Sequence, residues 1–263
     1  TDLSVAKALA QELEQTNQER KEIQEETFLE AESLMRNEID VDSQRVIVLA
    51  SEIFHPGVIG IAASKFVDKY HRPTVLIALE DGIGKGSGRS IPKFNLFKAF
   101  TDCSSHLIQF GGHAYAAGLS IQEENVAAFS DAMNAVGHRH LSEEDLIPEV
   151  KIDTTLDISQ INFTLYKNIS MLEPFGAENP VPSFQSQNIK IKEVKYIGKE
   201  KNHVRFRAVQ GRGQIEVVAF NFASIFESLD TAPEQFDIAY ELHLNSWNGR
   251  EKLELRLLDI RGV

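Results

Sequence analysis

The residues best suited to chemistry in this chain begin with a glycine-rich stretch, GIGKGSGRS, at residues 82–90. It combines the hydroxyl of Ser87 with the guanidinium of Arg89, and such a pair binds a phosphate well. Glycines alternate from Gly84 onward, which leaves one face of an extended chain bare, so we expect a ligand to lie on its backbone amides. The spacing matches neither a P-loop nor a dinucleotide-binding fingerprint. A flexible turn without a ligand is the alternative.

A second stretch, QFGGHAYAAG at residues 109–118, surrounds a histidine with small residues. Gly111 and Gly112 precede His113, and this composition is typical of a surface that a ligand approaches closely. A histidine can donate to a phosphate oxygen or bind a metal. His106 is seven residues away, and no Asp, Glu or Cys cluster with ligand spacing surrounds either histidine. We therefore expect no complete metal site within this chain.

A third cluster mixes basic and aromatic residues near the middle of the C-terminal half. In the segment HVRFRAV, which starts at His203, alternate residues share one face of a strand. We expect Phe206 in the core and the basic row on the outside, where charge would contact a nucleic-acid backbone and rings would contact bases. A merely solvated strand face is the alternative. The candidate contacts are Lys195, Tyr196, Lys199, His203, Arg205 and Arg207.

No constellation for nucleophilic catalysis stands out. The G-x-S-x-G elbow is absent from the sequence, and no histidine base is assigned to Ser87 by spacing. Cys103, the single cysteine, lies in a segment with helical character and excludes an internal disulfide, which fits a reducing, cytoplasmic setting. No apolar run reaches the ~18 residues of a membrane span.

The 263 residues carry a net charge of −12, and this charge is distributed unevenly along the chain. Residues 1–40 hold eleven acidic against four basic residues. Residues 82–101 hold four basic residues and no acidic one, and residues 186–213 hold eight basic and two acidic residues. A nucleic-acid partner must therefore be argued from these two basic segments rather than from the total.

The elements that must position these residues follow from hydrophobic patterning. Residues 2–38 lack Gly and Pro and predict one long, polar helix, expected to connect domains over residues 1–41. A strand, a helix with Pro56 suited to its first turn, and a second strand then predict a parallel pair in a mixed α/β domain, residues 42–142.

The C-terminal half changes character. Residues 143–187 predict a linker with one helix and a Pro/Gly-rich turn, EPFGAENPVPSF. From Asn188 to residue 263, five strands with one short helix before the fourth predict a small closed barrel of the OB type. The pair Asn248-Gly249 predicts a tight hairpin between the last two strands.

Four separated motifs together resemble the RecJ single-stranded-DNA-specific exonucleases. They are HPGVIGIAASKF, KGSGRSIPKFNLFKAF, QFGGHAYAAGL and LEPFGAENPVPSF. The resemblance covers almost the whole chain in the order connector helix, DHHA1 domain, OB domain. GGH followed by AAG alone would indicate only DHHA1, which also occurs in alanyl-tRNA synthetases and small phosphodiesterases.

The resemblance implies a 5′→3′ exonuclease of recombination and repair that clamps single-stranded DNA between a DHH domain and the DHHA1 domain. It implies that Ser87 and Arg89 hold the 5′ phosphate and that His113 faces the active cleft in a supporting catalytic role. The implied set for the phosphate and the DNA is Ser87, Arg89, Ser90, Gly111, Gly112 and His113.

One departure from the family pattern concerns metal. The family holds Mn²⁺ or Mg²⁺ on Asp and His residues of its DHH domain, and this sequence has no Asp-His-His motif. We therefore expect the chain to be the C-terminal part of such an enzyme, binding DNA without cleaving it alone. The DHH domain of the same polypeptide is an expected partner, and a single-strand-binding protein or another repair factor is a further candidate. The alternatives are a non-catalytic DNA-binding or scaffold module, and a phosphodiesterase relative acting on short RNA or cyclic dinucleotides.

Overall fold

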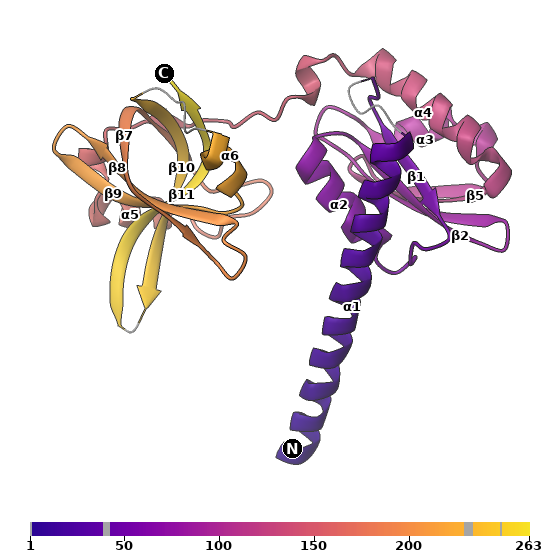
Figure 1. Ribbon diagram of the computed structural model, residues 1–263, viewed down its shortest axis with the longest axis horizontal. Helices are drawn as coiled ribbons and strands as arrows, with labels where there is room; N and C mark the ends of the chain where they lie inside the picture. Colours follow the sequence, from indigo (N-terminus) through magenta and orange to yellow (C-terminus); the bar gives the residue numbers. More distant parts are fainter. Residues whose placement is uncertain (1, 39–42, 229–233, 248) are drawn as a thin grey trace. The chain divides into compact units, whose positions relative to one another are not determined.

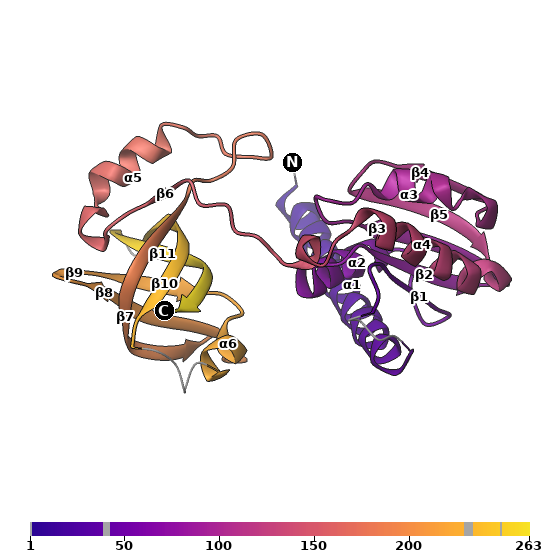
Figure 2. The same ribbon diagram turned by 90° about the horizontal axis from the view of Figure 1, so that it is seen from above.

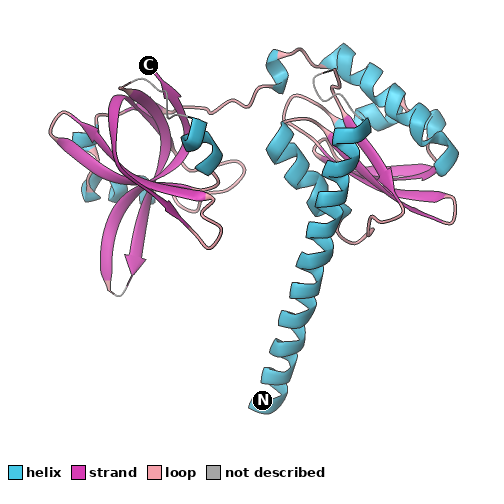
Figure 3. Ribbon diagram, viewed as in Figure 1, coloured by secondary structure: helices cyan, strands magenta, loops and turns pink. Residues whose placement is uncertain are grey.

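The computed structural model describes residues 2–38, 43–228, 234–247 and 249–263 (Figure 1). It divides into two compact units, Thr1–Pro148 and Glu149–Val263. Helices flank a sheet in unit 1, whereas strands dominate unit 2 (Figure 3). Within the described residues, no helix has both the length and the apolar character that crossing a bilayer requires.

Unit 1 is a five-stranded mixed sheet with helices on both faces. Its helices are α1 (Leu3–Glu38), α2 (Ile59–Tyr70), α3 (Leu96–Asp102) and α4 (Val126–His140). Its strands are β1 (Ile47–Ser51), β2 (Thr74–Glu80), β3 (Ile83–Arg89), β4 (Gln109–Gly112) and β5 (Ala116–Gln122). They lie in the order β1-β2-β3-β5-β4. Strands β1 and β2 pair in parallel, as the strand-helix-strand pattern predicts, and the other pairs are antiparallel.

The two faces of this sheet have separate cores. Strand β2 alternates between them, so Val75 and Ile77 pack with α3 and α4, whereas Leu76 and Ala78 pack with α1 and α2. Because both faces of β2 are buried, its sequence is almost continuously apolar. The prediction for α2 is wrong in one detail, because Pro56 lies in the turn before the helix.

Helix α1 is anchored to unit 1 by its C-terminal part, which lies beside α2 (Figure 2). Glu32 is 8% exposed, and its carboxylate forms an ion pair with Lys69 and accepts a hydrogen bond of 2.8 Å from Tyr70 Oη. Burial of Glu32 acts to raise its pKa, but the hydrogen bonds from Lys69 and Tyr70 outweigh burial and lower the pKa. By contrast, Leu9 and Leu13 near the N-terminus are 54% and 70% exposed.

Unit 2 is a closed barrel with two short helices. Its strands are β6 (Thr154–Thr155), β7 (Ser183–Ile197), β8 (His203–Gln210), β9 (Gly213–Ala219), β10 (Phe236–Trp247) and β11 (Arg250–Gly262). Its helices are α5 (Phe163–Ser170) and α6 (Ala223–Ser228). The sheet order is β10-β11-β9-β8-β7-β6, and an additional β7–β10 pairing closes five strands into a barrel. The predicted OB-type topology, with a short helix before the fourth barrel strand, is confirmed.

The barrel core and its hairpin also match the sequence patterns. Val204, Phe206 and Ala208 are buried, as strand alternation predicts. Strands β10 and β11 pair up to Trp247 opposite Arg250, so the expected tight hairpin is present, although Asn248 itself lies outside the described residues. The first barrel strand begins before Asn188, at Ser183.

Candidate nucleic-acid interface

The first candidate surface is an exposed part of the unit 1 sheet, on the face that α2 covers only in part. Strand β3 presents Lys85, Ser87 and Arg89 to this face, opposite the residues that enter the α3/α4 core. Ser87 pairs with Gly118 of β5, and Gly118 in turn pairs with Gly111 of β4. Both glycines are exposed. The result is a surface with little side-chain relief, bordered by basic groups.

We call this surface, formed by Lys85, Ser87, Arg89, Gly111 and Gly118, the open sheet face. Arg89 is its central positive charge. Its Nη1 donates to Ser87 Oγ at 3.1 Å and to the Gly88 carbonyl at 2.9 Å. Both side chains are partly buried, and these two hydrogen bonds orient the guanidinium. Among the described residues, no carboxylate lies within ion-pair distance of Arg89. Its positive charge is therefore available to an anionic ligand.

Gly60 is a site residue that the sequence reasoning missed. A methyl group at this position would lie 2.9 Å from Arg89 Nη2 and 3.0 Å from Ser87 Oγ. Gly60 is in the first turn of α2, where the helix dipole favours an anion, although the backbone N–H groups of Ile59 and Ile61 already donate to the His55 and Val58 carbonyls. The HPGVIG segment carries this signal, but from it we predict only a helix with Pro56 in its first turn and the family resemblance.

The GGH motif lies at the edge of the same sheet. Gly112 has φ of +141°, and a methyl group there would lie 2.5 Å from the Ala116 carbonyl, so the backbone requires glycine. His113 is exposed in the β4–β5 connection. Its backbone N–H donates a hydrogen bond of 2.8 Å to the Ala116 carbonyl. Ser90 follows β3, and its hydroxyl donates a hydrogen bond of 2.7 Å to the Phe94 carbonyl. The hydroxyl proton is therefore used within the loop.

The alternating glycines of β3 have a different role from the one expected. Methyl groups at Gly84, Gly86 and Gly88 would come within 2.6–2.8 Å of core side chains such as Ile77 and Leu119. The bare face of the strand is therefore filled by the α3/α4 core. The amides of β3 also pair with β2 and β5. The expectation that a ligand lies on these amides is wrong, and any ligand must use the opposite face of β3, which carries Ser87 and Arg89.

The described parts of the chain bring together no metal-binding group of three or more His, Cys, Asp or Glu residues. Around Arg89, the nearest functional groups are hydroxyl and guanidinium donors, and such a set binds anions rather than divalent cations. Cys103 is 2% exposed, and burial together with the nearby charge of Asp102 raises its pKa to about 11. It is an unreactive core thiol at neutral pH.

The second candidate surface is the outer face of β8 and its neighbours in the barrel. His203, Arg205 and Arg207 share this face, as predicted. Lys195 of β7 pairs with Arg205 on this face, whereas Tyr196 pairs with the core residue Val204 and therefore lies on the opposite face, where it is 41% exposed. Lys199 lies in the β7–β8 turn. These six expected contacts therefore come from one strand pair and its turn.

Part of the charge on this row is already neutralised. Arg207 lies 3.0 Å from Glu193, and Arg205 lies 4.0 Å from Glu216. His203 Nδ1 accepts a hydrogen bond of 3.0 Å from the N–H of Asn221. Exposed ion pairs of this type are weak, so a phosphate can compete for the arginines.

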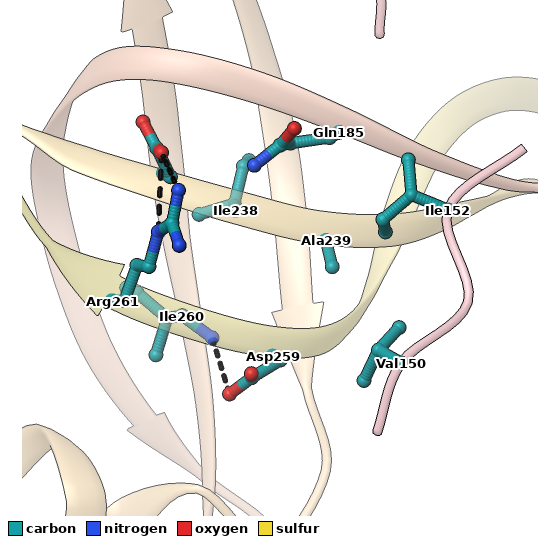
Figure 4. A pocket seen from close by; sticks show the side chains of 9 residues that line it. Val150, Ile152, Gln185, Ile238, Ala239, Asp259, Ile260 and Arg261 are labelled. Atoms are coloured by element: carbon teal, nitrogen blue, oxygen red, sulfur yellow. Dashed lines mark hydrogen bonds and ion pairs between the residues drawn. The ribbon is translucent and has the colours of Figure 1, made fainter. Parts of the chain in front are cut away.

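A separate pocket lies within unit 2 (Figure 4). It lies beside β10 and β11 and includes Ala239, Ile260 and Val150 in its lining. Its charged residues include Asp237 and Arg261, which form an ion pair of 2.9 Å. None of the residues proposed from the sequence lines it.

Comparisons with known proteins agree with this division. A family model described as "DHHA1 domain" matches residues 43–138, and one described as "RecJ OB domain" matches residues 152–259. The chain is 34% identical to the single-stranded-DNA-specific exonuclease RecJ of Bacillus subtilis, covering 97% of the chain and 32% of that protein. It is also 34% identical to the Haemophilus influenzae RecJ, covering 97% of the chain and 45% of that protein.

A solved structure is similar over the full chain. The crystal structure of RecJ in complex with Mn²⁺ from Thermus thermophilus superimposes with a TM-score of 0.80 and 28% identity, covering 100% of this chain and 37% of that one. The chain thus spans 32% and 45% of the length of the Bacillus subtilis and Haemophilus influenzae relatives.

Proposed function

The chain belongs to the RecJ family, and from this premise we propose that it is the DNA-binding part of a 5′→3′ single-stranded-DNA exonuclease of recombination and repair. The family match confirms the resemblance expected from the four motifs. In this proposal the open sheet face holds the 5′ phosphate, and the barrel grips the strand. The metal-bearing DHH domain of the same polypeptide catalyses the hydrolysis, and the enzyme acts in the cytoplasm.

The observation that carries the proposal is the unneutralised guanidinium of Arg89. It is held by Ser87 at 3.1 Å and lies against Gly60 in the first turn of α2. A guanidinium, a hydroxyl and a helix N-terminus form a complementary site for a phosphate dianion. The flat glycine surface of β4 and β5 beside it lets a strand approach the backbone closely.

In this proposal the metal ions are not bound by the open sheet face, because its residues offer no ligand set for a divalent cation. Mn²⁺ or Mg²⁺ in a DHH domain would supply the activated water for phosphodiester hydrolysis. The residues of this chain would bind and orient the 5′ end against that centre. In this proposal His113, which is exposed at the sheet edge, contacts a phosphate oxygen in a supporting role. A single-strand-binding protein or another repair factor remains a candidate partner of the complete enzyme.

The proposal is tested by equilibrium binding of single-stranded DNA of about 20 nucleotides, with and without a 5′ phosphate. We expect binding that weakens with salt, a preference for the phosphorylated end, and no cleavage by the chain in the presence of Mn²⁺. Arg89→Ala should remove the preference. Arg139→Ala, which removes an exposed arginine from α4 in the opposite helical layer, is the matched control and should retain it.

Three outcomes would contradict the proposal. Equal affinity of the unmutated chain for phosphorylated and unphosphorylated ends would remove the role of Arg89. Metal-dependent degradation by the purified chain would show that it needs no DHH domain. Tighter binding of dinucleotides than of the longer strand would favour the phosphodiesterase alternative.

A further inference from the structure

An exposed phenylalanine stands at the end of the basic row on the barrel. Phe220 directly follows β9 and is 46% exposed. The His203 ring lies 5.2 Å away in an edge-to-face arrangement, with an interplanar angle of 72°. The guanidinium carbon of Arg256 lies 5.6 Å from the centre of the Phe220 ring. We call these three residues the Phe220 cluster.

The barrel register explains why these side chains meet. Val204 pairs with Ala219, and both point into the core. Their neighbours His203 and Phe220 therefore point outward together. Strand β11 lies parallel to β9 and places Arg256 opposite Val218, on the same outer face.

Local hydrogen bonds fix the histidine in this cluster. Because His203 Nδ1 accepts from the Asn221 N–H, the neutral ring carries its proton on Nε2 and presents a donor there. Gly198, with φ of +92°, lies against the same ring, and a methyl group there would be 3.2 Å from His203 Cδ2. The β7–β8 turn and the β9–α6 connection thus hold the histidine from two sides.

The charges around the cluster differ from those of the rest of the row. Arg205 and Arg207 have carboxylate partners, Glu216 and Glu193. Within the described parts of the chain, Arg256 has no ion pair, and its guanidinium lies over one face of the Phe220 ring, which leaves the other face for a base. An exposed ring, an unpaired cation and an N–H donor therefore occur together, and this combination suits a base with its adjoining phosphate.

We propose that the Phe220 cluster is a base-stacking platform for single-stranded DNA, with Phe220 as the stacking residue. Arg256 and His203 contact the neighbouring phosphate or base edge. The proposal rests on the strand-gripping role of the barrel and names the residues that contact the bases. Stacking on a ring accepts every base, so the platform serves a strand of any sequence.

The test measures binding of the full chain to oligothymidylate of about 20 nucleotides by fluorescence anisotropy. Phe220→Ala should weaken binding about 5- to 150-fold, the loss of one stacked base. Phe220→Trp should retain affinity, and Phe220→Leu, which keeps apolar bulk without a π-face, should lose most of it. The matched control is Ile225→Ala on α6, a residue 41% exposed that should bind as the unmutated chain does.

A strand of the same length without bases separates stacking from a structural role. On this abasic strand the unmutated chain and Phe220→Ala should bind equally, because only the backbone remains to be contacted. Equal affinity of the two proteins for oligothymidylate would overturn the stacking role of Phe220, while the proposal that the barrel binds single-stranded DNA would stand. A loss of equal size on both strands would also overturn it, since it would indicate a disturbed barrel. Failure of the unmutated chain to bind either strand would overturn both proposals.

Discussion

Adding one methyl group at Gly60 should separate phosphate recognition from folding. The new Cβ would lie 2.9 Å from Arg89 Nη2 and 3.0 Å from Ser87 Oγ, against an ordinary contact distance of about 3.5–4.0 Å. The Arg89 guanidinium and the Ser87 hydroxyl must therefore each retreat by roughly 0.5–1 Å. Because the far end of an arginine moves easily, this displacement costs the fold little.

The consequences for stability and binding have opposite signs. Alanine is favoured over glycine in a helix by about 0.5–1 kcal/mol, so Gly60→Ala should melt at the same temperature or slightly higher. A hydrogen bond to a charged group contributes about 1.5–3 kcal/mol, so misplacing the guanidinium should reduce the affinity for a 5′-phosphorylated end about 10- to 100-fold. Affinity for a 5′-hydroxyl end should change little.

The assay pairs thermal unfolding by circular dichroism with binding to the two kinds of DNA end. Gly176→Ala adds a methyl group in open space in unit 2 and should change neither measurement. A folded Gly60→Ala variant that keeps the full preference for the phosphorylated end would refute the assignment of the phosphate to Arg89. A marked drop in melting temperature would refute the reasoning that the arginine can yield.

Two further predictions concern the framework of the site. Glu32→Gln should flatten the pH dependence of stability: the lowered pKa of Glu32 stabilises the fold above its ordinary value of 4.5, and this contribution is lost as pH falls through the folded pKa. Acid titrations of both proteins that stay parallel would contradict the anchoring role. Gly86→Ala would place a methyl group 2.8 Å from Leu119 and should cost about 1–3 kcal/mol, a drop of roughly 2–4 °C in melting temperature per kcal/mol. Gly118→Ala, whose new atom meets its nearest neighbour at 3.6 Å, should be tolerated, and equal stability of the two variants would contradict the packing explanation.

The sequence predicts well where local pattern and global fold agree. The single long helix follows from the absence of Gly and Pro, and α1 extends over Leu3–Glu38. The buried and exposed faces of β8 follow from alternation alone, and Val204 and Phe206 are in the core. The five barrel strands and their short helix follow from periodicity and turn residues.

The glycines show where such reasoning ends. Sequence alone indicates that Gly84, Gly86 and Gly88 leave a face bare, but it does not say what fills that face. Leu119, Ile77 and Leu96 fill it from other strands and from α3. The helix likewise starts at Ile59 rather than at Pro56, because residues 56–58 form a turn before it.

By itself the sequence determined the element types and the family, and it proposed candidate residues for binding a phosphate or a base, because these depend on local composition and spacing. Only the tertiary structure decided which face of β3 is available, that Gly60 lies against Arg89, and that Phe220 meets His203 and Arg256. The physical reason is that these contacts join residues far apart in the chain, through strand register and helix packing. No local pattern specifies such a register, since it is set by the burial of both sheet faces at once.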